Sequence, residues 1–197
     1  MQMKNTIILG GTIISEPTYY TQLKTGISLF RTLMCVNRTS GNTDVLPLVF
    51  SKEMLPEFEI GAKMRITGRL QTKNRDKHLD VFARVYNIEP YIDDENYVEF
   101  EGIIGKNVYF RSTPSGKVIT EATLANNIPR TSTSYVPTIF WGSVARFMSV
   151  ANVGERYETV GRFQSRQYMK NGEERICYEY SANYAHEMRG EENEDNN

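Results

Sequence analysis

Residues 135–148 read YVPTIFWGSVARFM, and the first half of this stretch alternates in the manner of a strand. Alternation places Tyr135 and Trp141 on one face and Val136 and Phe140 on the other. The second set is compact and apolar, which suits a core. The stretch therefore predicts a strand with one buried face and two aromatic rings on the opposite face.

A short helix is predicted directly after this strand. Ser143 is a candidate N-cap and Gly154 a candidate stop, and the residues between them that share a helical face are Val144, Phe147, Met148 and Ala151. The corresponding stretch of the first half, residues 51–58, contains Pro56, so a single turn or a broken helix is expected there.

The rest of the chain is typical of an all-β protein, because short runs of Tyr, Thr, Val, Ile and Phe are separated by Gly, Pro, Asn and Asp. Asn171-Gly172 is a strong hairpin turn. The predicted strands lie near residues 4–14, 28–37, 44–50, 62–72 and 78–88, then near 97–108, 117–126, 135–142, 156–167 and 175–185.

The two halves look like copies of one unit, with Gly11 and Gly102 near their starts. The matching pairs are Thr25-Gly26 with Ser115-Gly116, Phe50 with Phe140, Gly61 with Gly154, and Gly68-Arg69-Leu70 with Gly161-Arg162-Phe163. Five strands with a helix between the third and fourth is the OB-fold layout, so two tandem five-stranded OB barrels are predicted. A single large β-sandwich is the structural alternative.

The predicted boundaries follow from proline and acidic residues. We expect a first OB domain at 1–90, a linker at 91–96, a second OB domain at 97–188 and a disordered acidic tail at 189–197. The net charge is −1, but the tail and the run Asp93-Asp94-Glu95 hold much of the negative charge. The remainder of the chain is mildly basic, which leaves a nucleic-acid partner open.

Composition points to a reducing, cytoplasmic setting. The N-terminus lacks an apolar signal core, and no run reaches the length of a membrane span. The two cysteines, Cys35 and Cys177, lie in apolar stretches and are expected to be buried free thiols. Neither His78 nor His186 belongs to a metal-binding pattern, so no metal, no cofactor and no enzymatic activity are expected.

The second half resembles bacterial and phage single-stranded DNA-binding proteins. The residues that carry the resemblance are Glu101-Gly102-Ile103-Ile104-Gly105, Ser115-Gly116-Lys117, Thr123-Leu124-Ala125-Asn126-Asn127, Ile139-Phe140-Trp141-Gly142, Ala145, Gly154, Val160-Gly161-Arg162 and Tyr168. A weaker version runs through the first half, in Gly11, Glu16-Pro17, Thr25-Gly26, Met34-Cys35-Val36-Asn37-Arg38, Gly61 and Gly68-Arg69-Leu70.

This resemblance implies assembly as well as fold. Most members of that family join four single-OB chains, so two copies of this two-OB chain would supply the same number, and a homodimer is expected. The first strands of the two units, near residues 6–14 and 98–104, are the expected contact, with pairing inside one chain as the alternative. The tail lacks the Pro-Phe tip through which family members recruit partners, which leaves contacts with replication or recombination proteins open.

Binding of single strands without sequence preference needs aromatic platforms for bases and cations for phosphates. The resemblance implies stacking at Trp141, Tyr135 and Tyr168, although Trp141 could instead pack into the core. The candidate phosphate contacts are Arg130, Arg162, Arg166, Lys170, Arg111 and Lys117, joined in the first half by Arg38, Lys73, Arg75 and Lys77.

The hairpin tip of the first half, residues 73–78, is basic and has no aromatic residue, so this half could bind phosphates weakly or mainly support assembly. Tyr19, Tyr20 and Phe30 could stack on bases or pack into the protein.

These observations predict a non-enzymatic protein that binds single-stranded DNA, protecting and unfolding it during replication, recombination or DNA transfer. Binding of RNA is left open, and no membrane partner is expected. The alternative is a primosome-type accessory OB protein that acts mainly through protein–protein contacts. A nuclease is the third hypothesis.

Overall fold

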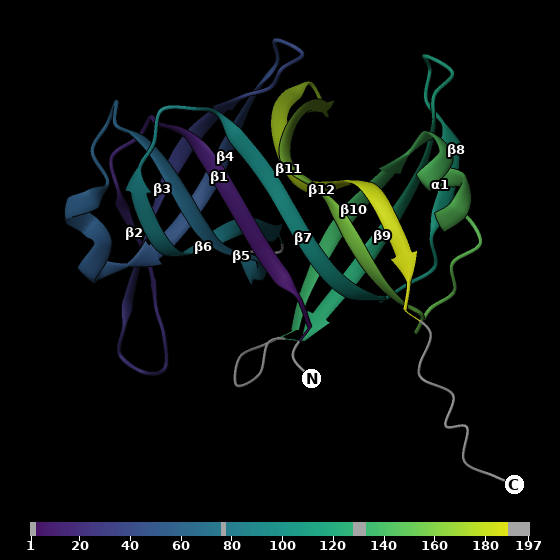
Figure 1. Ribbon diagram of the computed structural model, residues 1–197, viewed down its shortest axis with the longest axis horizontal. Helices are drawn as coiled ribbons and strands as arrows, with labels where there is room; N and C mark the ends of the chain where they lie inside the picture. The colour runs from purple at the N-terminus through teal and green to yellow at the C-terminus, as the bar shows by residue number, and fades with distance from the viewer. Residues whose placement is uncertain (1–2, 76–77, 128–132, 189–197) are drawn as a thin grey trace, which may run out of the picture.

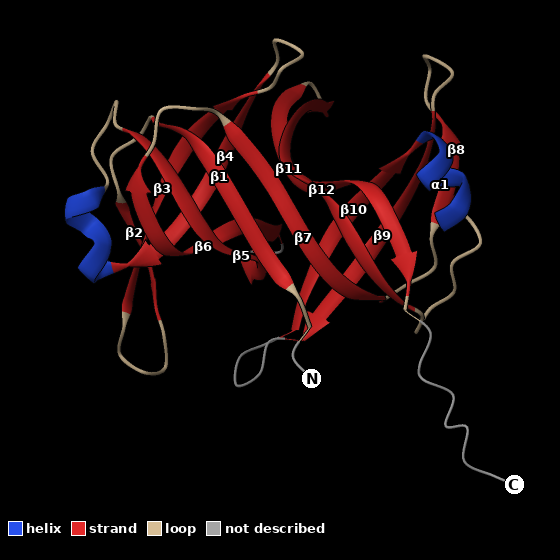
Figure 2. Cartoon of the chain, in the orientation of Figure 1, coloured by secondary structure: helices blue, strands red, loops and turns tan. Residues whose placement is uncertain are grey.

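The computed structural model describes residues 3–75, 78–127 and 133–188, and strands make up most of it (Figures 1 and 2). In the first half they are β1 (Asn5–Ile13), β2 (Thr18–Gln22), β3 (Ser28–Asn37), β4 (Thr43–Ser51), β5 (Lys63–Arg75) and β6 (His78–Pro90), with the 3-10 helix η1 (Lys52–Glu57) after β4. In the second half they are β7 (Glu95–Ile104), β8 (Tyr109–Ser112), β9 (Val118–Asn127), β10 (Thr133–Trp141), β11 (Arg156–Lys170) and β12 (Glu173–Glu187), with the helix α1 (Gly142–Met148) after β10.

Each of the ten strands predicted from sequence is present, and two further strands were missed. Both missed strands, β2 and β8, are short and lie at the two ends of the strand order, where β2 pairs with β3 and β8 with β9. Tyr20 shows why β2 forms, because its ring is buried against Phe82. Such a contact between distant residues leaves no periodic signal in a five-residue segment.

In each half, five strands pair in a closed series, so that the last strand of the series pairs with the first. In the first half β1 pairs with both β3 and β5, while β4 pairs with β3 and, in parallel, with β6. In the second half β7 pairs with both β9 and β11, while β10 pairs with β9 and, in parallel, with β12. The same pairing pattern therefore occurs twice, as the repeat in the sequence predicted.

Two equivalent glycines show how closely the halves correspond. Gly68 and Gly161 each follow a register shift, between Thr67 and Gly68 and between Val160 and Gly161. A Cβ atom at either position would clash with a carbonyl oxygen of the neighbouring strand. Only glycine allows this close approach of two backbones.

The helix after β10 differs from the prediction in three respects. It begins at Gly142, so Trp141 and not Ser143 occupies the N-cap, and no side chain caps it. It ends at Met148, well before Gly154. Phe147 is exposed, and the buried residues of the helix are Ala145 and Met148. The one-turn spacing of that pair leaves Phe147 on the outer side.

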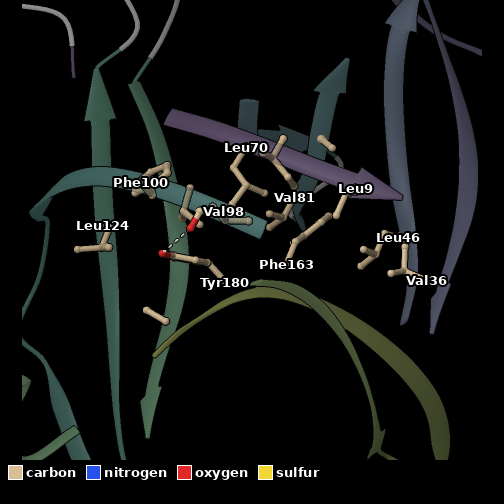
Figure 3. Close-up of a cluster of buried hydrophobic side chains, with 14 of the residues drawn as sticks. Leu9, Val36, Leu46, Leu70, Val81, Val98, Phe100, Leu124, Phe163 and Tyr180 are labelled. Atoms are coloured by element: carbon tan, nitrogen blue, oxygen red, sulfur yellow. Dashed lines mark hydrogen bonds between the residues drawn. The ribbon is translucent and has the colours of Figure 1, made fainter. Parts of the chain in front are cut away.

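The two halves are joined along β1 and β7, which lie side by side in the middle of Figure 1. They pair antiparallel from Asn5↔Phe100 to Gly10↔Glu95. The strands expected to contact a second copy therefore pair within one chain, since that pairing already satisfies their backbone groups. The hydrophobic core is continuous across the junction, from Leu9 and Leu70 to Phe163 and Tyr180 (Figure 3).

A buried carboxylate also links the two halves through hydrogen bonds. Asp44, fully buried on β4, accepts two hydrogen bonds from the Arg38 guanidinium at 2.6 and 2.5 Å. The same carboxylate accepts the backbone N–H of Ser165 on β11 at 2.8 Å. One acidic residue of the first half thereby fixes both a nearby arginine and a strand of the second half.

Candidate nucleic-acid interface

Strand β10 presents its aromatic residues as the alternation predicted. Val136 and Phe140 are fully buried, whereas Tyr135 is 51% and Trp141 38% exposed. Trp141 therefore does not pack into the core. The two rings are held by a strand whose other face is anchored in the core, so their positions are fixed before any ligand arrives.

Trp141 lies at the edge of a hollow of about 360 Å³, which we call the Trp141 hollow. Four of its lining residues are cations that the sequence singled out: Arg38, Lys117, Arg162 and Arg166. Arg38 comes from the first half, so the hollow draws on both copies of the repeat. A hollow lined by an aromatic ring and four cations is suited to hold a base with its phosphates, although Arg38 is paired with Asp44 and Arg166 with Glu179.

The charges of the Trp141 hollow favour an anion. Burial lowers the pKa of the Arg162 guanidinium, and the neighbouring Arg38 lowers that pKa further. Asp44 offsets part of this repulsion but is itself engaged by Arg38 and Ser165. A phosphate placed between the two guanidinium groups would relieve the remaining repulsion.

A second hollow, of about 620 Å³, adjoins the first and contains Tyr135. We call it the Tyr135 hollow. It shares Arg166 with the Trp141 hollow and is also lined by Tyr109 and Lys106, which the sequence did not single out. Tyr109 lies on β8, the strand that the sequence did not predict, so its place beside Tyr135 could not be anticipated.

The third hollow, of about 710 Å³, is the Tyr168 hollow. It shares Leu79, Pro137 and Glu179 with the Tyr135 hollow, so the three hollows adjoin in series, and we call them together the groove. The lining of the groove comes from both halves of the chain. The Arg166 guanidinium lies 5.8 Å from the centre of the Tyr168 ring. The remaining cations here are Arg31, Arg75 and Arg175.

Arg31 and Arg175 were missed by the sequence analysis. Arg175 stands directly opposite Tyr168 in the hairpin. Counting outward from both sides of the Asn171-Gly172 turn would have placed Arg175 opposite Tyr168, because both turn residues adopt the positive φ angles expected of them, 54° and 79°. Arg31 donates to Asp80 at 2.7 Å, and no local pattern in the sequence indicates that pair.

Other predicted contacts lie elsewhere. Arg111 forms an ion pair with Glu121 at 2.5 Å and lines none of the three hollows. Lys73 donates to Thr21 and lies 5.6 Å from the centre of the Tyr20 ring, outside the groove. Three further predictions, for Arg130, Lys77 and the tail 189–197, lie outside the described residues, as does the side chain of Lys170.

The structure also bears on the cysteines, on metal-binding groups and on the length of the helices. Cys35 and Cys177 are free, as predicted, but half-buried rather than fully buried. Within the described residues, no group of three or more His, Cys, Asp or Glu side chains is placed to hold a metal ion. Neither helix of the described chain has the length and apolar run that crossing a bilayer requires.

Comparison with known proteins gives a clear result for the fold alone. No protein-family profile and no curated protein matches the sequence. Among solved structures, the wild-type single-stranded DNA binding protein from Thermus aquaticus superposes with a TM-score of 0.76 at 19% identity, covering 96% of each chain. A deletion mutant of that protein gives the same TM-score at 18% identity, covering 99% of each chain.

A third structure, the N-terminal domain of PriB from Thermoanaerobacter tencongensis, is 25% identical and covers 45% of this chain and 98% of its own. Its TM-score is 0.40. The Thermus aquaticus structures, in contrast, match from one end of the chain to the other. This chain is therefore a mostly β protein that shares the fold of the Thermus aquaticus protein over nearly its full length.

Proposed function

We propose that this protein binds single-stranded DNA without strong sequence preference and has no enzymatic activity of its own. The observation that carries the proposal is the groove, in which Trp141, Tyr135 and Tyr168 lie among basic residues, with Asp80, Glu121 and Glu179 also in the lining. Exposed rings on a rigid sheet accept any base, because every base has a flat face. Cations between the rings would follow the phosphates.

The same proposal includes the finer architecture. Each closed set of five paired strands is an OB-type barrel, with β2 and β8 as additional edge strands and a short helix between the third and fourth barrel strands. The barrels correspond to residues 1–90 and 97–188, followed by an acidic tail. The full-length similarity to the Thermus aquaticus protein supports this arrangement.

In the cell the protein would cover single strands exposed in the cytoplasm during replication, recombination or DNA transfer. It would unfold hairpins by mass action, because it binds the unpaired state and not the duplex. Two copies would associate as a homodimer through surfaces other than the paired β1 and β7.

The proposal is tested by comparing a labelled single strand with a duplex of the same length and sequence in an anisotropy titration. The single strand should bind much more tightly, and its affinity should fall as salt rises. Equal affinities would overturn the proposal. Weak binding that salt hardly changes would favour a protein–protein role instead.

A further inference from the structure

An exposed aromatic residue with two arginines near its ring lies in the first half. Tyr86 on β6 is 53% exposed, and the guanidinium carbons of Arg69 and Arg84 lie 5.6 and 5.8 Å from its ring centre. Arg84 is held in place because it donates to the backbone carbonyl of Val49 at 3.2 Å. The described groove does not include this cluster, which we call the Tyr86 cluster.

The register shifts place Tyr86 at a special position of the repeat. Gly68 pairs with Val85 and Thr67 with Asn87, which leaves Tyr86 as the extra residue of the bulge. In the second half, Gly161 pairs with Ala182 and Val160 with Tyr184, which leaves Asn183 as the extra residue. Tyr86 and Asn183 are therefore equivalent.

The parallel pairings relate this position to Trp141. In the second half the register Phe140↔Ala182, continued by one residue, brings Trp141 beside Asn183. In the first half the register Val49↔Arg84, continued by two residues, brings Ser51 beside Tyr86.

The neighbouring pair is thus tryptophan and asparagine in one half and serine and tyrosine in the other. Each half has one aromatic residue at this place, but the two come from different strands. Arg69 and Arg162 are likewise equivalent, because each follows the glycine of the bulge. The first half thus repeats the arrangement of ring and arginine that lines the Trp141 hollow.

We infer that Tyr86, with Arg69 and Arg84, is a second stacking site for a base of single-stranded DNA. This inference rests on the proposed function and extends it to the first half. More than half of the Tyr86 side chain is exposed, so the ring remains accessible to a base. The two guanidinium groups supply the positive charge that the adjoining phosphates need.

The electrostatics of Arg84 agree with an anionic ligand. Burial lowers the pKa of its guanidinium, while Tyr86 and Glu53 oppose that shift. A phosphate beside Arg84 would favour the charged form more strongly than the exposed carboxylate of Glu53 does. A phosphate would therefore stabilise the Tyr86 cluster as it would stabilise the pair of Arg38 and Arg162.

The test uses the full chain and an oligothymidylate of about 32 nucleotides, the upper site size expected for two OB units. Tyr86→Ala should weaken binding roughly 5- to 150-fold, the equivalent of one lost base–aromatic stack. Tyr86→Phe should bind as the unmodified protein does. The matched control is Tyr97→Ala, which removes an exposed tyrosine of β7 that lines none of the hollows.

A fluorescence experiment observes the Tyr86 cluster directly. Trp141 is the sole tryptophan of the chain, so the Trp141→Phe/Tyr86→Trp variant carries its only indole in the first half. Its emission should be quenched by the oligonucleotide. A strand exchange gives an independent check, because adding Ser51→Trp to Tyr86→Asn should restore the affinity that Tyr86→Asn alone loses.

The outcomes separate the two proposals. If Trp141 of the unmodified protein is quenched, while the Trp141→Phe/Tyr86→Trp variant is not and Tyr86→Ala binds normally, the inference is overturned and the proposed function stands. If the oligonucleotide binds neither protein, the proposed function itself fails. Thermal unfolding of Tyr86→Ala confirms that any lost affinity is not lost folding.

Discussion

Asp44→Asn should destabilise the protein far more than its small change in shape suggests. The carboxylate binds Arg38 through two hydrogen bonds and also accepts the backbone N–H of Ser165. Removing one partner of a buried ion pair costs about 3–5 kcal/mol. We expect about 3 kcal/mol, the lower end of that range, because the Arg38 side chain keeps 19% of its surface exposed.

For a protein of this size, that loss of unfolding free energy lowers the melting temperature by about 6–12 °C. The assay is urea unfolding followed by circular dichroism and by Trp141 emission, together with a thermal scan. Asp93→Asn is the control, because it makes the same chemical change on an exposed carboxylate and should stay within about 0.5 kcal/mol. Equal midpoints for the two variants would refute the claim that Asp44 joins the halves.

Four further predictions follow from the proposed function. Trp141→Ala and Tyr168→Ala should each weaken binding of a single strand by about 1–3 kcal/mol in an anisotropy titration, and unchanged affinity in a folded variant would remove that residue from the site. Lys73→Gln with Arg75→Gln should lower the slope of log affinity against log salt by about 0.7 for each phosphate that the variant no longer binds; an unchanged slope would mean that neither side chain touches DNA. Deleting residues 189–197 should strengthen binding slightly at low salt and hardly at all at high salt, since an acidic tail competes with phosphates; equal affinity at low salt would show that the tail does not reach the groove. Sedimentation should give twice the chain mass of 22.7 kDa, and the mass of one chain would rule out the homodimer.

Periodic patterns in the sequence were enough to predict the long strands. Alternation located β10 and assigned Val136 and Phe140 to the core, because half-buried strands repeat every two residues. The spacing of Gly68 and Gly161 revealed the repeat, because close backbone approach leaves no choice of residue there. Strand positions and close backbone approaches were therefore predictable, because each depends on residues that are near one another in the sequence.

Contacts between the halves were not predictable in the same way. Nothing near Arg38 in the sequence indicates that it lines a hollow with Trp141, because that proximity depends on how β4 meets β11. The pairing of β1 with β7 has the same character, since either strand could equally have paired with a second chain. Long-range pairing is decided by the whole fold and leaves no local signal.

Matching the two halves by sequence also missed the Tyr86 cluster. That comparison paired Phe50 with Phe140 and found a basic hairpin tip without an aromatic residue at 73–78, so it predicted weak phosphate binding or support of assembly for the first half. The register of β4 with β6 ends at Val49↔Arg84, and its continuation places Tyr86 of β6 beside Ser51 of β4. Two aromatic rings can occupy equivalent places in the two halves although they come from different strands and therefore from non-matching positions in the sequence.

The central claim, that the groove lined by Trp141, Tyr135 and Tyr168 binds single-stranded DNA, is tested most directly by Trp141 emission. The single tryptophan of the chain lines the Trp141 hollow, so a change in its fluorescence reports on the surroundings of that ring. Titration with an oligothymidylate at two salt concentrations should give saturable quenching, with weaker affinity at the higher salt. An emission that the single strand leaves unchanged, or that a duplex quenches equally well, would contradict the account.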